Sequence, residues 1–223
     1  MTATAPDLEA ATAQEVLAYG VEHFHPRLTL ACSFQKEESV LFHMLSEIEP
    51  RAQAFTIDTG VLFPETLTTW KQFEDRFPLP IRVMDARSPG EPWTAQNCCG
   101  EAKVAGLEAA LADVDAWITG IRREQAATRS AAPKLDYDDR RGIWKLNPLA
   151  DWTEKDIWTY IFKHDLPYHP LHDEGYSSIG CAPCTLPGEG RDGRWAGTDK
   201  TECGLHVAAS PGSTSTTDGS PVV

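Results

Sequence analysis

Short runs of β-branched and aromatic residues alternate along this chain with longer stretches in which apolar residues recur at helical spacing. Such alternation is typical of βαβ units built around a parallel sheet. The short runs predict strands at 27–32, 53–58, 80–85, 115–119 and 143–146. The longer stretches predict helices at about 8–24, 37–48, 64–77, 98–112 and 153–165. We therefore expect an α/β fold in which helices flank a mostly parallel sheet.

The regular pattern weakens toward the end of the chain. The last predicted helix starts at Thr153 and has Asp156 three positions later, which imitates a capping box. From 166 onward Pro, Gly and His become frequent, and we expect irregular structure there. Small polar residues dominate 207–223, a composition typical of a disordered tail. We predict a single domain over 1–206, because 223 residues can bury one sizeable core.

Three loops should follow the carboxyl ends of the strands, where open parallel sheets bind their ligands. They are CSFQKEES (32–39), DTGVLFPET (58–66) and TGIRREQAATR (119–129). The first loop combines serines, backbone amides and a helix N-terminus, which together suit a phosphate group. An ordinary βα turn has the same general form, so this loop alone does not decide between the two interpretations.

The net charge of −13 argues against general nucleic-acid binding, which relies on an excess of Lys and Arg. An anionic ligand must therefore meet a local basic patch, and such patches occur at 120–129 and 189–195. No apolar run approaches the roughly 20 residues of a membrane helix, and the first residues lack the features of a secretory signal. We therefore expect a cytoplasmic protein that does not bind membranes.

In that reducing compartment the six cysteines favour metal ligands or redox thiols over structural disulfides. Cys98 and Cys99 are adjacent and poorly placed to bond to each other, while Cys181 and Cys184 form a C-x-x-C clamp. Four thiolates in two groups suit one metal site, either tetrahedral zinc or an iron–sulfur cluster. Adjacent side chains at a helix start diverge by about 100°, which a cluster with separate irons accepts more easily than one zinc ion.

Several longer segments carry a specific resemblance. The chain is similar to assimilatory adenylyl-sulfate (APS) reductases of the bacterial type that holds a [4Fe–4S] cluster. The resemblance covers about 28–206, and its segments are SFQKEES, IDTG, CCGEAKV, TGIRREQAATR, NPLADWTEKDIW, LPYHPLHDEGYSSIGCAPCT, GRDGRW and DKTECGLH. It implies an adenine-nucleotide α-hydrolase-like fold, one cluster held by Cys98, Cys99, Cys181 and Cys184, and a catalytic cysteine in ECGLH, here Cys203. The catalytic segment would span about 186–206.

The resemblance also implies which residues hold the nucleotide and its phosphosulfate, and it places Lys103 close to the cluster. The implied substrate-binding residues are Ser33, Phe34, Gln35, Lys36, Glu37, Ser39, Asp58, Thr59, Gly60, Lys103, Gly120, Arg122, Arg129, Arg191 and Arg194. The sequence departs from the family pattern at Ala102, usually basic, at Gly106, usually Pro, and at His169, usually Asn. We interpret Cys32, which ends a strand, as a buried small hydrophobic residue, and the role of His206 stays open.

The implied reaction is a two-step thiol displacement. Attack of the Cys203 thiolate on the sulfur of APS would release AMP and leave a Cys203 S-sulfonate. A thiol of thioredoxin or glutaredoxin would then liberate sulfite. Alternatives are reduction of the 3′-phosphorylated substrate (PAPS) or of both substrates, a tRNA-thiolating ATP pyrophosphatase, and a non-catalytic redox or cluster-binding module. The sequence leaves open the choice between APS and PAPS, the thiol donor and whether the chain forms a homo-oligomer.

Overall fold

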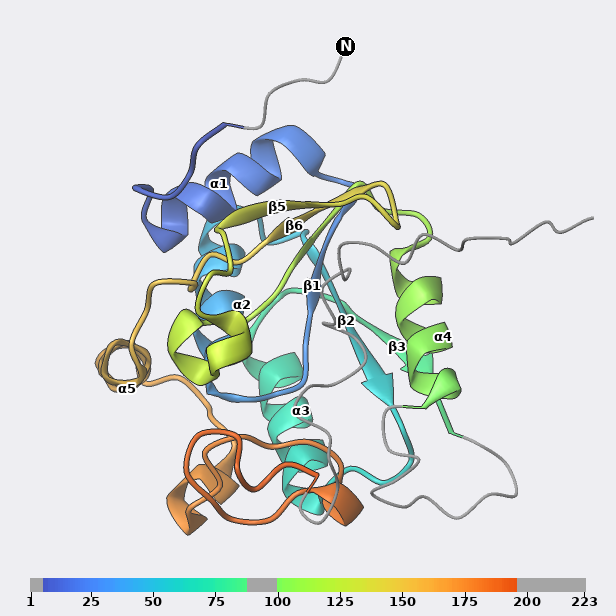
Figure 1. Ribbon diagram of the computed structural model, residues 1–223, viewed down its shortest axis with the longest axis vertical. Coiled ribbons are helices and arrows are strands. Elements are labelled where there is room, and N and C mark those ends of the chain that lie inside the picture. Colours follow the sequence, from blue (N-terminus) through green and yellow to red (C-terminus); the bar gives the residue numbers. More distant parts are fainter. Residues whose placement is uncertain (1–5, 88–99, 196–223) are drawn as a thin grey trace, which may run out of the picture.

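A computed structural model describes residues 6–87 and 100–195 of the chain. Within these residues a six-stranded sheet has the order β3-β2-β1-β4-β6-β5 (Figure 1). Every pair of neighbouring strands is parallel except β5 and β6, which are antiparallel. The strands are β1 (Leu28–Ala31), β2 (Gln53–Asp58), β3 (Ile81–Asp85), β4 (Ala116–Ile118), β5 (Leu135–Asp138) and β6 (Ile143–Leu146). The prediction of an α/β fold with a mostly parallel sheet is confirmed.

The predicted strands agree closely with the observed ones, but β5 was missed. Predicted strands 53–58 and 143–146 coincide with β2 and β6, and the other three exceed the observed strands by one or two residues. β5 has the sequence LDYD and pairs on one side only, antiparallel to β6. Its two aspartates disfavour a strand by local propensity, so only the pairing with β6 accounts for it.

Each predicted helix is present among the described residues, and most of the observed helix ends lie inside the predicted ranges. The helices are α1 (Ala13–Phe24), α2 (Lys36–Ile48), α3 (Pro64–Arg76), α4 (Glu101–Leu111) and α5 (Glu154–Lys163). The predicted start of the first helix at 8 is wrong, because the Thr12 side chain caps α1 and forms a capping box with Glu15. The predicted capping box of Thr153 and Asp156 is confirmed at α5.

The predicted helix over 98–112 begins later than expected. Gly100 has an extended backbone (φ −71°, ψ −168°) and is the N-cap of α4. A helix that included 98 would need helical angles at this glycine, so the prediction is wrong at its start. Cys98 and Cys99 lie outside the described residues.

The helices cover both faces of the sheet and bury two apolar clusters. Side chains of α1, α2, α3 and α5 share the larger cluster with Leu28, Leu30 and Ile118 of the strands. Leu107 and Leu111 of α4 pack on the opposite face against Phe55 and Trp117. Alternate strand residues therefore face opposite layers, as the pleat of a strand requires. The two layers hold the carboxyl ends of the strands in fixed positions.

The segment after α5 is irregular, as predicted, and contains two 3₁₀ turns, η3 (Pro170–Glu174) and η4 (Ala182–Cys184). An isolated bridge pairs Leu62, in the loop after β2, with Cys181. Figure 1 shows this segment in orange beside the start of α3, beyond the carboxyl end of β2. Across the described part of the chain, no helix has the length and apolar character needed to span a membrane.

Candidate active site

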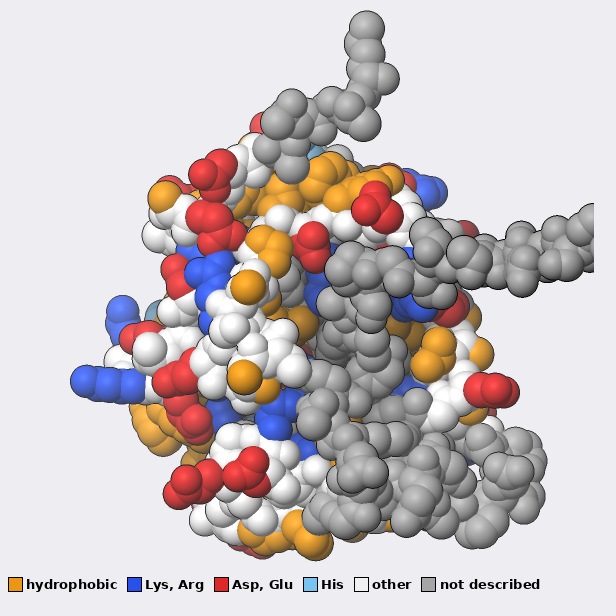
Figure 2. Space-filling view, in the orientation of Figure 1, with side chains coloured by type: hydrophobic (Ala, Val, Ile, Leu, Met, Phe, Trp, Pro, Cys, Tyr) orange, Lys and Arg blue, Asp and Glu red, His pale blue; other side chains and the backbone are white. Residues whose placement is uncertain are grey.

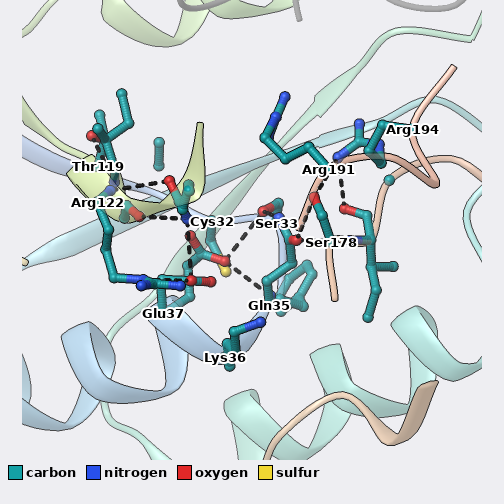
Figure 3. A pocket seen from close by; sticks show the side chains of 18 of the residues that line it. Cys32, Ser33, Gln35, Lys36, Glu37, Thr119, Arg122, Ser178, Arg191 and Arg194 are labelled. Carbon is teal, nitrogen blue, oxygen red and sulfur yellow. Dashed lines mark hydrogen bonds and ion pairs between the residues drawn. The ribbon is translucent and has the colours of Figure 1, made fainter. Parts of the chain in front are cut away.

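A pocket with about 200 Å³ of free space lies where the loops after β1 and β4 meet the segment 177–181. Figure 3 shows Glu37 and Arg122 at one end and Arg191 and Arg194 at the other. The pocket brings together eleven of the residues that the sequence implied for substrate binding. They are Ser33, Phe34, Gln35, Lys36, Glu37, Lys103, Gly120, Arg122, Arg129, Arg191 and Arg194.

The loop after β1 is shaped by a buried aromatic residue with an unusual backbone. Phe34 has φ +60°, a left-handed conformation that costs energy for a bulky side chain. Its buried ring stacks on Trp70 with 5.3 Å between centroids and meets Phe73 edge-on at 5.6 Å. These contacts hold the turn, so that the amides which follow lead directly into the N-terminus of α2. The loop thus has the predicted strand–turn–helix form, but its Gln35 amide already donates to a carboxyl oxygen of Glu38 at 2.9 Å.

Two adjacent glutamates at the start of α2 carry opposite pKa perturbations. Burial and the neighbouring Glu37 raise the pKa of Glu38 to about 8, although its Oε2 accepts hydrogen bonds from the Gln35 amide (2.9 Å) and the Ser33 hydroxyl (3.2 Å). Burial also acts on Glu37, but the charges of Lys36 and Arg122 prevail and lower its pKa. Glu38 therefore retains its proton at neutral pH while Glu37 is ionised.

Arg122 and Lys36 neutralise the acidic end of the pocket. Arg122 Nε donates to Glu37 Oε1 at 3.0 Å, and Nη1 donates to Glu124 Oε2 at 2.9 Å. Lys36 Nζ lies 2.8 Å from the carbonyl of Ser177 and 3.2 Å from a carboxylate oxygen of Glu154. Arg122 and Lys36 are each almost fully buried and held by carboxylates. These two cations thus balance fixed protein charge before any ligand arrives.

The basic end of the pocket is formed by the segment after η4. The guanidinium of Arg194 lies over the Trp195 ring at 4.6 Å, and that of Arg191 lies over the same ring at 5.2 Å. Arg129, from η2 (Ala127–Arg129), lines the pocket and donates to Gln125 Oε1 at 2.6 Å. In Figure 2, Lys and Arg side chains gather near the centre of the face, with most Asp and Glu side chains toward its margin. The overall negative charge is therefore compatible with a locally basic site.

The C-x-x-C clamp lies beside this pocket. Cys181 is the N-cap of the 3₁₀ turn η4 and Cys184 is its last residue, and both cysteines are buried. Cys181 Sγ lies 3.2 Å from Thr59 Oγ1, and Cys181 also lines the pocket. Two buried thiols on one tight turn fit half of a four-thiolate site. Cys98 and Cys99, the other predicted ligands, and the predicted nucleophile Cys203 lie outside the described residues.

Four predicted binding residues do not line the pocket. Asp58 and Gly60 form a turn in which the Gly60 amide donates to Asp58 Oδ1 at 2.8 Å, and Gly60 has φ +71°. Thr59 contacts the clamp instead, as described above. Ser39 is fully buried in α2, and its hydroxyl has no hydrogen-bond partner among residues 6–87 and 100–195. These four residues therefore do not form the wall of the pocket.

The sequence missed several pocket residues. Glu38, Ser177, Ser178 and Ile179 line the pocket although none was named among the predicted binding residues, and of the four only Glu38 lies in a predicted ligand-binding loop. Glu38 could have been found, because it occupies the third helical position after the loop, where a capping-box acid belongs. No local sequence pattern marks Ser177–Ile179 as pocket residues, because only the fold brings them next to the loop after β1. Cys32 is buried as predicted, and burial raises its thiol pKa well above the ordinary value.

His169 and His172 serve the segment around η3. The Nδ1 atom of His169 accepts from the Leu171 amide at 3.3 Å, so its Nε2 carries the proton toward Thr66 Oγ1 at 2.8 Å. This links η3 to α3. His172 Nδ1 lies 2.7 Å from the carbonyl of Tyr176. Within the described ranges, no three His, Cys, Asp or Glu side chains are grouped so that they could hold a metal ion.

Comparison with known proteins gives consistent results. The family model for the phosphoadenosine phosphosulfate reductase domain matches residues 27–187. A Gloeobacter violaceus protein named phosphoadenosine 5′-phosphosulfate reductase is 45% identical over 212 residues, covering 87% of this chain and 88% of that protein. A Bacillus mycoides protein named adenosine 5′-phosphosulfate reductase is 42% identical over 214 residues, covering 89% and 92%. The crystal structure of phosphoadenylyl-sulfate reductase from Candida auris, in complex with phosphate, superimposes with a TM-score of 0.67 at 25% identity, covering 80% and 94%.

Proposed function

The chain belongs to the phosphoadenosine phosphosulfate reductase domain family, and we propose that it reduces adenosine 5′-phosphosulfate (APS) to sulfite and AMP. The observation that carries the proposal is the pocket at the carboxyl ends of the strands, whose wall includes Cys181 together with Arg129, Arg191 and Arg194. Guanidinium groups pair with phosphate and sulfate oxygens and stay charged at all working pH values. The site thus combines an anion-binding end with cysteine chemistry.

The division of charge within the pocket indicates how the nucleotide would lie. Arg122 and Lys36 are already paired with carboxylates, which disfavours an anion at that end. We place the adenosine there and the phosphosulfate at the end formed by Arg191 and Arg194. The proton held by Glu38 helps, because a second ionised carboxylate beside Glu37 would add negative charge to the wall.

Cys203 would supply the nucleophile. Its thiolate attacks the sulfur of APS, a sulfur–sulfur bond forms, and the sulfur–oxygen bond breaks so that AMP leaves with the electron pair. One thiolate of a dithiol reductant, thioredoxin or glutaredoxin, then attacks Cys203 Sγ and expels sulfite. The second thiol of the reductant resolves this mixed disulfide and restores Cys203. Both electrons come from the dithiol, which leaves as a disulfide. Such exchange suits a reducing cytoplasm.

We assign a [4Fe–4S] cluster to Cys98, Cys99, Cys181 and Cys184. The buried pair on η4 provides two ligands on one rigid turn, and the adjacent pair in the sequence completes the set. Such a cluster supplies an electrostatic centre in this scheme, since the dithiol already provides both electrons. Lys103 lines the same pocket as Cys181, so its charge acts on both the anion and the clamp.

PAPS is the second candidate substrate, because the Gloeobacter relative carries that name at an identity similar to that of the Bacillus relative. We favour APS, because a 3′-phosphate on the adenosine would approach the end where both cations are taken by carboxylates. The adjacent cysteines also favour APS through the resemblance to cluster-containing reductases.

Sulfite release from APS and from PAPS, measured in parallel with reduced thioredoxin, tests the proposed function. We expect sulfite from APS at a kcat/KM at least tenfold above that for PAPS. The Cys203→Ser variant should release none from either while it still binds AMP. Equal or higher activity with PAPS would reverse the substrate assignment, and no sulfite from either compound would refute the function.

A further inference from the structure

We propose that Ser178 and Gly180 are positioning residues that aim the guanidinium group of Arg194 into the pocket, and that Gln35 fixes Ser178 in turn. The inference rests on the proposed function for the identity of the anion, but its structural basis is independent of it. None of the three residues needs to touch the ligand for this role. The role concerns how well one arginine is preorganised.

Arg194 is held at an unusually buried position for an arginine. Its side chain is only 8% exposed. Nη1 donates to the hydroxyl of Ser178 and to the carbonyl of Ile179, each at 3.2 Å, and the Trp195 ring lies under the guanidinium at 4.6 Å. Nε is buried and has no hydrogen-bond partner within the described part of the chain. A buried guanidinium with an unused donor in a pocket wall is arranged to receive an anion.

Gly180 is required by the close approach of this guanidinium. A Cβ atom built at Gly180 would lie 2.4 Å from Arg194 Nη2 and 2.6 Å from Cζ. Both distances are far inside van der Waals contact, so any side chain here would displace the guanidinium from its place. Gly180 therefore sets the plane in which Arg194 lies, between the backbone before Cys181 and the Trp195 ring.

Gln35 fixes the same stretch of backbone from the other side. Its Oε1 accepts from the Ile179 amide at 2.8 Å and from the Ser178 hydroxyl at 3.4 Å, and its Nε2 donates to the Ser33 hydroxyl at 3.0 Å. Figure 3 shows Gln35, Ser178 and Arg194 in sequence along this side of the pocket. The first loop and Arg194 thus meet at Ser178.

The direction of these hydrogen bonds follows from the groups involved. The Ile179 amide can only donate, so the Gln35 oxygen must face it. Ser178 has one hydroxyl proton, which it gives to the same oxygen, and its lone pair is then turned toward Arg194 Nη1. A rotated hydroxyl would present a proton to a guanidinium donor. Ser178 therefore acts as a directed acceptor for Arg194 rather than as a general polar contact.

The test is a double-mutant cycle on the full-length holoprotein, with Ser178→Ala and Arg194→Ala made singly and together. Binding of APS, AMP and adenosine is measured by isothermal titration calorimetry. We expect Ser178→Ala to weaken APS binding about five- to tenfold, since Arg194 keeps only one of its two acceptors. In the Arg194→Ala background the same change should have less than a twofold effect, because there is no guanidinium left to position.

Two further measurements separate positioning from a general structural role. Adenosine, which carries no anion, should bind the wild type and Ser178→Ala equally, and Ser178→Thr should restore APS binding because it keeps the hydroxyl. Ser46→Ala is the matched control, since the Ser46 hydroxyl also donates a hydrogen bond, in its case to the backbone carbonyl of His43, but Ser46 does not line the pocket. Iron content and far-UV circular dichroism should be the same in all variants.

The possible outcomes distinguish this inference from the proposed function. Equal loss of APS affinity from Ser178→Ala with and without Arg194 would mean that Ser178 contacts the ligand itself, and would overturn the positioning role. No loss in either background would overturn it as well. If the double-mutant cycle gives the predicted result with APS but the protein releases no sulfite, the positioning role stands and the proposed reaction is refuted. Failure to bind any of the three compounds would refute both.

Discussion

Replacing Glu38 by Gln should stabilise the protein, and the gain should grow as the pH rises. Glu38 is buried beside the ionised Glu37, and burial together with that charge raises its pKa to about 8. A glutamine keeps an acceptor oxygen for the Gln35 amide and the Ser33 hydroxyl, which both donate to Glu38 in the wild type. The substitution therefore removes the titration while it retains the two hydrogen bonds.

The size of the effect follows from the two pKa values. Below pH 4.5, the ordinary value, Glu38 is protonated in both the folded and the unfolded chain and costs nothing. Between 4.5 and about 8 only the unfolded chain ionises, so the folded state loses stability as the pH rises. Each pH unit between these two pKa values is worth about 1.4 kcal/mol. The free energy of unfolding of the wild type should therefore lie below that of Glu38→Gln by about 2 kcal/mol at pH 6 and by up to about 5 kcal/mol at pH 9.

Urea unfolding of the holoprotein under anaerobic conditions, at intervals from pH 5 to pH 9, measures this difference directly. Glu37→Gln is the matched control, because Glu37 is ionised and paired with Arg122 at 3.0 Å. Removing its charge leaves the buried guanidinium of Arg122 with Glu124 as its remaining ion-pair partner, and should lower the free energy of unfolding by up to about 3 kcal/mol at neutral pH. A constant difference between Glu38→Gln and the wild type across the pH range, or a more stable wild type at pH 9, would refute the assigned protonation of Glu38.

Three further substitutions test other parts of the structure. Gly180→Ala should weaken APS binding about tenfold by calorimetry, because its methyl group would overlap Arg194. Gly106→Ala is the control and should bind APS as the wild type does, since its methyl group would meet other side chains only at 3.4 Å or beyond. Cys184→Ser should lose iron and sulfide in colorimetric assays of anaerobically prepared protein, while Cys32→Ala retains both; zinc without sulfide in the wild type would contradict the cluster assignment. His169→Ala should lower the free energy of unfolding by about 1–3 kcal/mol in urea, because Thr66 and the Leu171 amide lose their partner; no loss would show that this link between α3 and η3 adds nothing.

Local signals in the sequence were sufficient for most of the fold. Alternation of short apolar runs with amphipathic stretches identified the bounds of β2 and β6 to the residue. Strands of a parallel sheet are rich in apolar residues, which makes such runs easy to recognise. The pattern failed at β5, where pairing with β6 outweighs the local preference of two aspartates. It also failed at the start of α4, where Gly100 has an extended backbone and the helix begins only at Glu101.

The candidate site could be predicted only in part, for a related reason. The loop that contains Ser33 and Gln35 was predicted to bind a ligand because it follows the end of a strand, and the resemblance to APS reductases implied these two residues individually. Ser178 and Ile179 were missed because their role depends on contact with Gln35, more than a hundred positions earlier in the chain. Arg122 was predicted to bind the ligand, and it does line the pocket, but no sequence pattern indicated that Glu37 and Glu124 already hold its charge.

Transfer of the sulfonate group to Cys203 tests the central claim most directly. Holoprotein is incubated with APS in the absence of any thiol reductant, and peptide mass spectrometry is combined with measurement of released AMP. We expect one SO₃ group on Cys203 and one AMP per chain, with neither formed by Cys203→Ser, which should still bind AMP. An adduct on Cys32 or Cys181 instead, or AMP release that continues in Cys203→Ser, would contradict the proposed mechanism.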